Sequence, residues 1–264
     1  MSEENDQFNG NGSRPSPEPE GPGPFANVVR LPTRAEREEK KRRQKQAQKQ
    51  ERVQNPSRRE PLFNLPPVTK YLLGLFLLVH IGIALFLSPE RQYALFNHFG
   101  FTPGYYSGQI PLNWPAFAGP FTYMFIHANW MHIGLNGLML MAFGAGVERW
   151  MGKARMLVFF TLCSLASALA HFLLNPDSLS PVVGASGGLS GLFAAVLIMM
   201  NRQRDAAGMR HVSLLPLVLL WVAISVIFGV IGGPDGSTIA WAAHVGGFLA
   251  GFALIGPVMK MGRK

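Results

Sequence analysis

The chain has 264 residues, a formal net charge of +9 at pH 7 and a single cysteine, Cys163. One cysteine excludes an intrachain disulfide and argues against a metal cage built from thiolates. Hydrophobic residues make up 48% and charged residues 15% of the chain. These totals occur in soluble and membrane proteins alike, so the order of the residues must separate the two classes.

The first 60 residues hold 13 Lys or Arg and 10 Asp or Glu among Pro, Gly, Gln and Asn. With so few large apolar side chains to bury, we expect residues 1–62 to form a disordered, basic cytoplasmic tail. No secretory signal or mitochondrial presequence is expected there. A basic run before a membrane span can bind nucleic acid, but it is more typical of contact with anionic lipid or of plain solubility. This run consists of Lys40, Lys41, Arg42, Arg43 and Lys45.

Beyond this tail, apolar stretches alternate with short connectors. About 20 helical residues cross roughly 30 Å of hydrocarbon. A single segment that crosses lipid must be a helix, because any other conformation leaves backbone N–H and C=O groups unpaired at a high cost. We therefore predict an all-α, polytopic bundle of six transmembrane helices over residues 63–259, with a short cytoplasmic end at 260–264. The expected spans are 68–88, 121–147, 156–174, 185–200, 212–232 and 239–259.

Lys and Arg residues are concentrated in alternate connectors. Because such residues accumulate in short cytoplasmic loops, this pattern predicts that both termini are cytoplasmic. The connectors after the second and fourth spans and the C-terminal end contain Arg149, Lys153, Arg155, Arg202, Arg204, Arg210, Lys260, Arg263 and Lys264.

Two of the expected outer connectors differ sharply in composition. Residues 89–120 carry eight aromatic side chains, which favours a position in the membrane interface, where such rings lie at headgroup level. Residues 232–237 are small and polar, as is typical of a hinge. We expect this second connector to act as a movable lid between the fourth and sixth spans.

His132 and Asn136 are spaced i and i+4 and therefore share one face of the second expected span. A hydrogen bond to a neighbouring helix, worth about 0.6 kcal/mol in membranes, explains such a pair without any catalysis. The functional interpretation is a pair of donors directed at a developing oxyanion, where each donor is worth roughly 10²-fold in rate. The pair alone does not decide between these interpretations.

Ser186 lies in the sequence Gly-Ala-Ser-Gly at the start of the fourth expected span. Small residues of this kind also let helices approach closely, so the motif alone is weak evidence. A serine at a helix N-terminus, however, has free backbone N–H groups beside it, and these favour negative charge on a bound carbonyl oxygen.

His244 lies about six residues into the last expected span, on the same face as Gly247 and Gly251. If this face packs against the glycines of the fourth span, the imidazole comes near Ser186 and can take its proton. The expected spans contain no acidic residue to orient His244. The sequence therefore predicts a Ser-His dyad rather than a Ser-His-Asp triad.

These segments resemble the signature motifs of the rhomboid intramembrane proteases. The resemblance covers about residues 62–259 and places three motifs in the right order on the second, fourth and sixth spans. They are HANWMHIGLN at 127–136, GASG at 184–187 and AHVGGFLAG at 243–251, with further similarity at Glu148, Arg149 and Gly152 and at Phe99, Gly100, Phe101 and Pro103.

The resemblance implies a serine-type endopeptidase of the bacterial inner membrane. It implies that Ser186 is the nucleophile and His244 the general base, without metal or nucleotide. Its substrates would be single-span membrane proteins, cut near helix-destabilising small residues at the outer face. The oxyanion would be held by His132, Asn136 and the Ser186 amide, with support from His127, Gly184 and Gly247.

Two positions depart from the family pattern. Many relatives carry a Trp-Arg pair before the second span, where this chain has Ala118, Gly119 and Pro120. Some relatives stack an aromatic side chain on the catalytic histidine, whereas this chain has Ser190 at that position. The anchoring of the first loop and the orientation of His244 are therefore expected to differ.

Two other functions compete with proteolysis. One is a catalytically inactive rhomboid-like protein that binds other membrane proteins, although both dyad residues are present here. The other is a transporter or metal-binding protein that uses His127, His132 and His244. Histidines at i and i+5 share a helix face poorly, and no carboxylate within the expected spans could join them.

Overall fold

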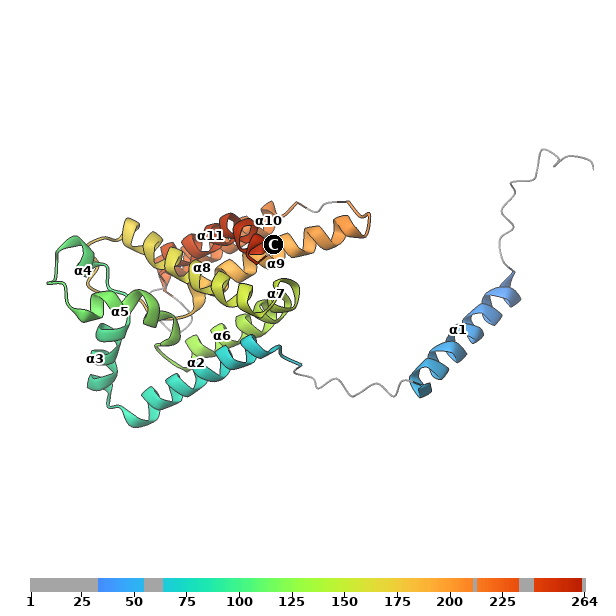
Figure 1. The fold of residues 1–264 in the computed structure, drawn as a ribbon, viewed down its shortest axis with the longest axis horizontal. Coiled ribbons are helices and arrows are strands. Elements are labelled where there is room, and N and C mark those ends of the chain that lie inside the picture. Colours follow the sequence, from blue (N-terminus) through green and yellow to red (C-terminus); the bar gives the residue numbers. More distant parts are fainter. Residues whose placement is uncertain (1–32, 55–63, 211–212, 233–239, 263–264) are drawn as a thin grey trace, which may run out of the picture. The chain divides into compact units, whose positions relative to one another are not determined.

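The computed structural model describes residues 33–54, 64–210, 213–232 and 240–262 (Figure 1). Two units are distinguished, Met1–Leu62 and Phe63–Lys264. The described part of the first unit is a single helix, and that of the second unit is built from helices with one isolated β-bridge between Phe101 and Val182. The predicted all-α class is confirmed.

Helix α1 spans Arg34–Gln54, within the segment expected to form a disordered tail. The segment contains neither Gly nor Pro and consists mainly of strong helix formers, Glu, Lys, Arg, Gln and Ala. Thr33 and Glu36 form a reciprocal capping box: the Thr33 N–H donates to the Glu36 carboxylate at 2.6 Å, and the Glu36 N–H donates to the Thr33 hydroxyl at 3.3 Å. The rest of the expected tail lies outside the described residues.

The second unit contains ten α-helices in its described part, together with one 3₁₀ turn, η1, and one π-helical turn, η2. Three of the α-helices and η1 form the first long loop. In chain order the elements are α2 Pro67–Phe86, α3 Pro89–Phe99, α4 Gly104–Ser107, α5 Trp114–Thr122, η1 Tyr123–Phe125, α6 Trp130–Met139, η2 Leu140–Gly144, α7 Ala145–Met151, α8 Lys153–Leu174, α9 Ser186–Ala206, α10 Leu215–Ile231 and α11 Trp241–Lys260.

Four continuous helical segments in the described part are long and apolar enough to cross a membrane: α2, α6 to α7, α8 and α11. The remaining two expected spans correspond to α9 and α10. Helix α9 begins with Gly and Ser and ends with Arg202 and Arg204, which lowers its mean hydropathy, and α10 is apolar but has only 17 residues. A count of six spans therefore stays a prediction.

The second expected span, 121–147, has the wrong boundaries, because the corresponding helix begins at Trp130. Residues 121–125 belong instead to α5 and η1, and Ile126 is extended. The Asn129 side chain caps α6 by accepting a hydrogen bond from the His132 N–H at 2.9 Å. This cap lies inside an almost unbroken apolar run, so hydropathy alone does not reveal the helix start.

Helix α11 packs most extensively against α8 and α9, and glycines bring α9 and α11 into backbone contact. A Cβ atom added at Gly247 would lie 2.0 Å from the Gly187 carbonyl oxygen, and one added at Gly251 would lie 2.7 Å from that of Gly191. No larger residue fits either position without moving the helices apart. This contact sets the position of the C-terminal helix relative to the nucleophile motif.

Glu148, on α7, fixes the start of α2. Its carboxylate is buried and accepts hydrogen bonds from the N–H groups of Val68 and Thr69 and from the Thr69 hydroxyl, at 2.8–2.9 Å. A negative side chain here satisfies N–H groups that have no partner within the first turn of a helix. Arg149 adds a hydrogen bond to the carbonyl of Asn64. The two residues thus connect the second helical segment to the first.

Candidate active site

Ser186 is the first residue of α9, and the segment before it is held by the first loop. Phe101 and Val182 exchange two backbone hydrogen bonds, at 2.9 and 2.8 Å. The Gly184 N–H donates to the Tyr123 carbonyl at 2.9 Å. Gly184 has a φ of +117°, a conformation that side-chain-bearing residues rarely adopt, and this turn directs the chain into the helix.

Nε2 of His244 lies 2.7 Å from Oγ of Ser186, at hydrogen-bond distance. The two side chains come from helices α11 and α9, whose glycine faces meet beside them. Both residues are half-buried, so neither is sealed off within the helix bundle. In the neutral tautomer protonated at Nδ1, the imidazole accepts the hydrogen bond that the Ser186 hydroxyl donates.

A carboxylate does not orient His244 within the described residues. The described part of the chain also contains no group of three His, Cys, Asp or Glu residues placed to hold a metal ion. The geometry therefore presents a hydroxyl and an imidazole as a pair, positioned by helix packing.

His132 and Asn136 both face the turn that precedes Ser186. A Cβ atom added at Gly184 would lie 2.6 Å from Nε2 of His132 and 3.7 Å from Nδ2 of Asn136. Asn136 is 2% exposed, and its Nδ2 group has no hydrogen-bond partner among the described residues. A buried amide without a partner is costly unless a ligand completes it. These side chains are the predicted oxyanion donors, and the structure brings them beside the nucleophile turn.

His127 is fully buried and lies just before α6. Its ring is 5.3 Å from that of His132 and 5.2 Å from that of Phe76, measured between centroids. Its carbonyl group lies 3.2 Å from Nδ1 of His80, on α2. His80 also contacts Trp130 edge-to-face at 4.6 Å. The start of α6 is therefore braced against α2 by this group of rings.

Tyr123 connects the first loop to the site, and its role was not apparent from the sequence. Its carbonyl accepts the hydrogen bond from Gly184, while its hydroxyl donates to the Ser164 carbonyl on α8 at 2.6 Å. The side chain is 1% exposed. Tyr123 lies within the expected second span, where a tyrosine is usually an interfacial ring. Its place in the loop becomes apparent only because α6 starts later in the chain than expected.

The two departures from the family pattern have visible structural counterparts. At the missing Trp-Arg pair, Gly119 packs against the backbone of Gly100, because a Cβ atom added there would lie 2.6 Å from the Gly100 carbonyl oxygen. The Ser190 hydroxyl donates to the Ser186 carbonyl at 2.7 Å, within α9. The first loop is thus anchored by close backbone contact, and Ser190 satisfies its own helix rather than stacking on the imidazole.

Comparison with known proteins gives one family. Residues 116–260, more than half of the chain, match the family profile described as "Rhomboid domain". This region contains Ser186, His244, His132 and Asn136, whereas the α2 side chains and the contacts of Gly100 and Phe101 lie before it.

Several curated proteins are similar to this chain. The "Putative rhomboid protease YdcA" of Bacillus subtilis is 26% identical over 195 residues, which cover 74% of this chain and 90% of that protein. "RHOMBOID-like protein 1" of Arabidopsis thaliana is 31% identical over 134 residues, 51% of this chain and 32% of that protein. "Rhomboid-type serine protease 2" of Emericella nidulans is 31% identical over 147 residues, 54% of this chain and 27% of that protein.

Proposed function

The chain belongs to the rhomboid family, and on that premise we propose that it is an intramembrane serine endopeptidase with Ser186 as nucleophile and His244 as general base. It is an integral, multi-pass membrane protein, as its family and its long apolar helices indicate. The observation that carries the proposal is the 2.7 Å distance between Ser186 Oγ and His244 Nε2. Such a separation lets a neutral imidazole take the hydroxyl proton as the oxygen attacks.

The reaction follows from this pair in two halves. Ser186 Oγ bonds to the scissile carbonyl carbon while its proton passes to His244, and the imidazolium then protonates the leaving amine as the peptide bond breaks. Water next attacks the acyl-enzyme, giving its proton to His244, which returns a proton to Ser186 as the new carboxyl group leaves. Each half passes through a tetrahedral oxyanion.

The oxyanion is held by the Ser186 N–H, His132 and Asn136. The Ser186 N–H belongs to the first turn of α9, where backbone donors have no partner within the helix. The unpartnered Nδ2 of Asn136 supports its assignment as a second donor. Donors already in position at the developing charge account for a large part of the rate in acyl transfer.

The substrates are single-span membrane proteins, cut near small, helix-destabilising residues at the outer face. The site lies at the starts of α9 and α11, and the distribution of Lys and Arg supports placing these ends at the outer side of the membrane. The resemblance to rhomboid proteases supports a bacterial inner membrane. The expected lid at 232–237 lies outside the described residues except for Gly232. This residue follows the last residue of α10 and has a φ of +89°.

The proposal is tested with purified protein in liposomes and a panel of single-span substrates. Wild type is expected to cleave at least one of them, and Ser186→Ala to cleave none. Ser213→Ala, which changes an exposed serine before α10, is the matched control and should retain full activity. If folded wild type cleaves nothing on the panel and also fails to react with a fluorophosphonate, the chain is an inactive relative that binds membrane proteins.

A further inference from the structure

Helix α1 carries its excess positive charge on one face. It contains nine Lys or Arg and four Glu in 21 residues. At 100° per residue, seven of the nine basic positions and a single Glu fall within a band of about 140°. This basic face comprises Arg34, Arg37, Lys41, Arg42, Lys45, Lys49 and Arg52, with Glu38 among them.

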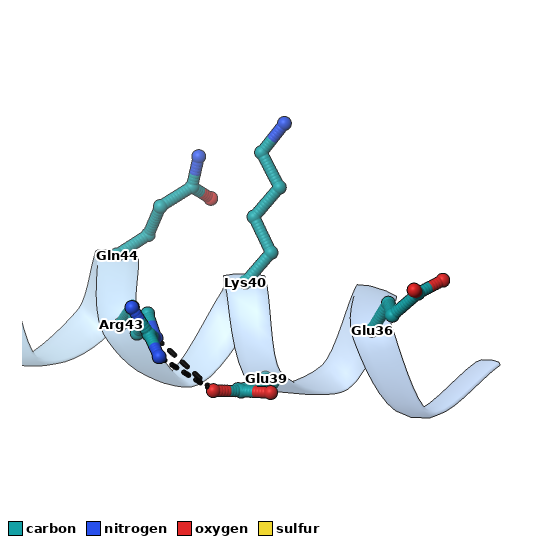
Figure 2. Close-up of a pocket in the computed structure, with 5 residues that line it drawn as sticks. All are labelled: Glu36, Glu39, Lys40, Arg43 and Gln44. Atoms are coloured by element: carbon teal, nitrogen blue, oxygen red, sulfur yellow. Dashed lines mark hydrogen bonds and ion pairs between the residues drawn. The ribbon is translucent and has the colours of Figure 1, made fainter. Parts of the chain in front are cut away.

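The opposite face is close to neutral. Figure 2 shows part of it, a shallow hollow lined by Glu36, Glu39, Lys40, Arg43 and Gln44, in which Arg43 donates to Glu39 at 2.8 Å. The acidic residues there offset the two basic ones. The excess of positive charge is therefore confined to one face of α1. The run of basic residues in the sequence, by contrast, is spread over both faces.

We propose that the basic face of α1 binds the anionic phospholipid headgroups of the membrane in which the same chain is embedded. Arg34, Arg37, Lys41 and Arg42 are exposed, as headgroup contact requires. Polybasic segments near a membrane are attracted by about 1 kcal/mol per Lys or Arg, an interaction that falls off within a Debye length. The proposal is independent of the protease assignment and would hold for an inactive relative.

The short connection between α1 and α2 keeps α1 close to the membrane surface. Only residues 55–66 separate the end of α1 at Gln54 from the start of the first spanning helix at Pro67. Twelve residues reach at most roughly 40 Å when fully extended. A tether of this length gives the helix a high local concentration of headgroups, so a modest affinity suffices for binding.

The chemistry of α1 favours headgroup contact over insertion. The helix lacks an apolar face, because Ala35, Ala47 and Val53 are its only apolar residues. An interfacial helix that buries itself below the headgroups needs such a face. We therefore expect α1 to lie on the phosphates and to be released by salt. Nucleic acid offers similar phosphates, but a membrane surface is always within reach of the tether, and a nucleic acid is not.

The test uses the full chain in nanodiscs of pure phosphatidylcholine, mixed with separate vesicles and sedimented. Vesicles that contain phosphatidylglycerol should bind the discs, and pure phosphatidylcholine vesicles should not. High salt should abolish binding, since the Debye length falls from about 10 Å at 0.1 M to about 3 Å at 1 M. Excess inorganic phosphate, at matched ionic strength, should leave binding intact, because free phosphate lacks the density of charge on a membrane.

Two matched double variants distinguish the effect of the basic face from the effect of the net charge of α1. Arg37→Glu with Lys41→Glu reverses two charges on the basic face, and Lys40→Glu with Arg43→Glu reverses two on the neutral face. The first double variant removes the ion pair of Lys41 with Glu38, and the second removes that of Arg43 with Glu39. At about 1 kcal/mol per charge, the first pair should lower the vesicle partition constant at least about 20-fold, and the second pair should lower it much less.

Equal losses in the two double variants would show that only net charge matters and would overturn the proposal. So would sedimentation that does not depend on phosphatidylglycerol. A third arm adds a short duplex DNA to the same discs. Tighter binding to DNA than to anionic vesicles, weakened selectively by the basic-face variant, would assign the face to nucleic acid instead.

Discussion

The backbone of Gly187, one residue after the nucleophile, lies directly against Gly247, one turn after the base. A Cβ atom added at Gly247 would lie 2.0 Å from the Gly187 carbonyl oxygen. Gly247→Ala should therefore push α11 away from α9, lower activity at least tenfold and cost about 1–3 kcal/mol in stability. Gly256→Ala is the matched control on the same helix, since a Cβ atom there meets no other atom within 4 Å. Activity assays beside thermal unfolding would check both, and equal effects at the two glycines would contradict the packing argument.

Asn136→Ala should slow cleavage without disarming the nucleophile. Losing one oxyanion donor typically costs about 10²–10³-fold in kcat. Because Ser186 and His244 remain paired, a fluorophosphonate should still label Ser186. Labelling should be slower than in wild type, because the adduct resembles the oxyanion that Asn136 holds. The measurement is kcat and KM on one transmembrane substrate. Cleavage by the variant at the wild-type rate would show that Asn136 does not hold the oxyanion.

Much of the site follows from the sequence because it depends on local spacing. Ser186 and His244 lie near the starts of the fourth and sixth expected spans, and glycines at i+3 and i+7 from His244 mark the face by which the helices meet. The spacing of His132 and Asn136 likewise fixes their common direction. These relationships need only helical periodicity and the order of the spans.

The missed features depend on contacts that no periodicity encodes. Helix α6 starts at a cap buried in an apolar run, so Tyr123 was placed in a span and its hydrogen bond to Gly184 was not foreseen. Glu148 was noted for its position in a motif, but its partners lie about 80 residues away. The helicity of α1 was missed because low hydrophobicity was taken to mean disorder, although the segment has strong helix propensity.

Glu148→Ala should destabilise the membrane unit. The change leaves the N–H groups of Val68 and Thr69 and the Thr69 hydroxyl without their acceptor, at a cost of roughly 2–4 kcal/mol. Thermal unfolding of the purified protein should show a lower Tm, with cleavage retained at low temperature. Glu90→Ala, in the first turn of α3, provides the control, because Glu90 is exposed. An unchanged Tm in the Glu148 variant would mean that water replaces the carboxylate.

The start of α1 should respond to acid through Glu36. Hydrogen bonds from Thr33, the backbone N–H first and the hydroxyl second, hold the pKa of Glu36 below its ordinary value of 4.5. A depressed pKa stabilises the capped helix fully above that ordinary value, and the contribution is lost as the pH falls through the lowered one. NMR titration of the Glu36 carboxyl should show a midpoint below 4.5 that rises in Thr33→Ala. An identical midpoint in both chains would contradict the capping box.

The most direct test of the central claim is fluorophosphonate labelling in detergent, with the modified residue located by mass spectrometry. The account predicts one adduct, on Ser186, that forms in wild type, disappears in Ser186→Ala and forms far more slowly in His244→Ala, because the hydroxyl then has no base at 2.7 Å. Labelling of Ser186 at the wild-type rate in His244→Ala, or no adduct on Ser186 in folded wild-type protein, would contradict it.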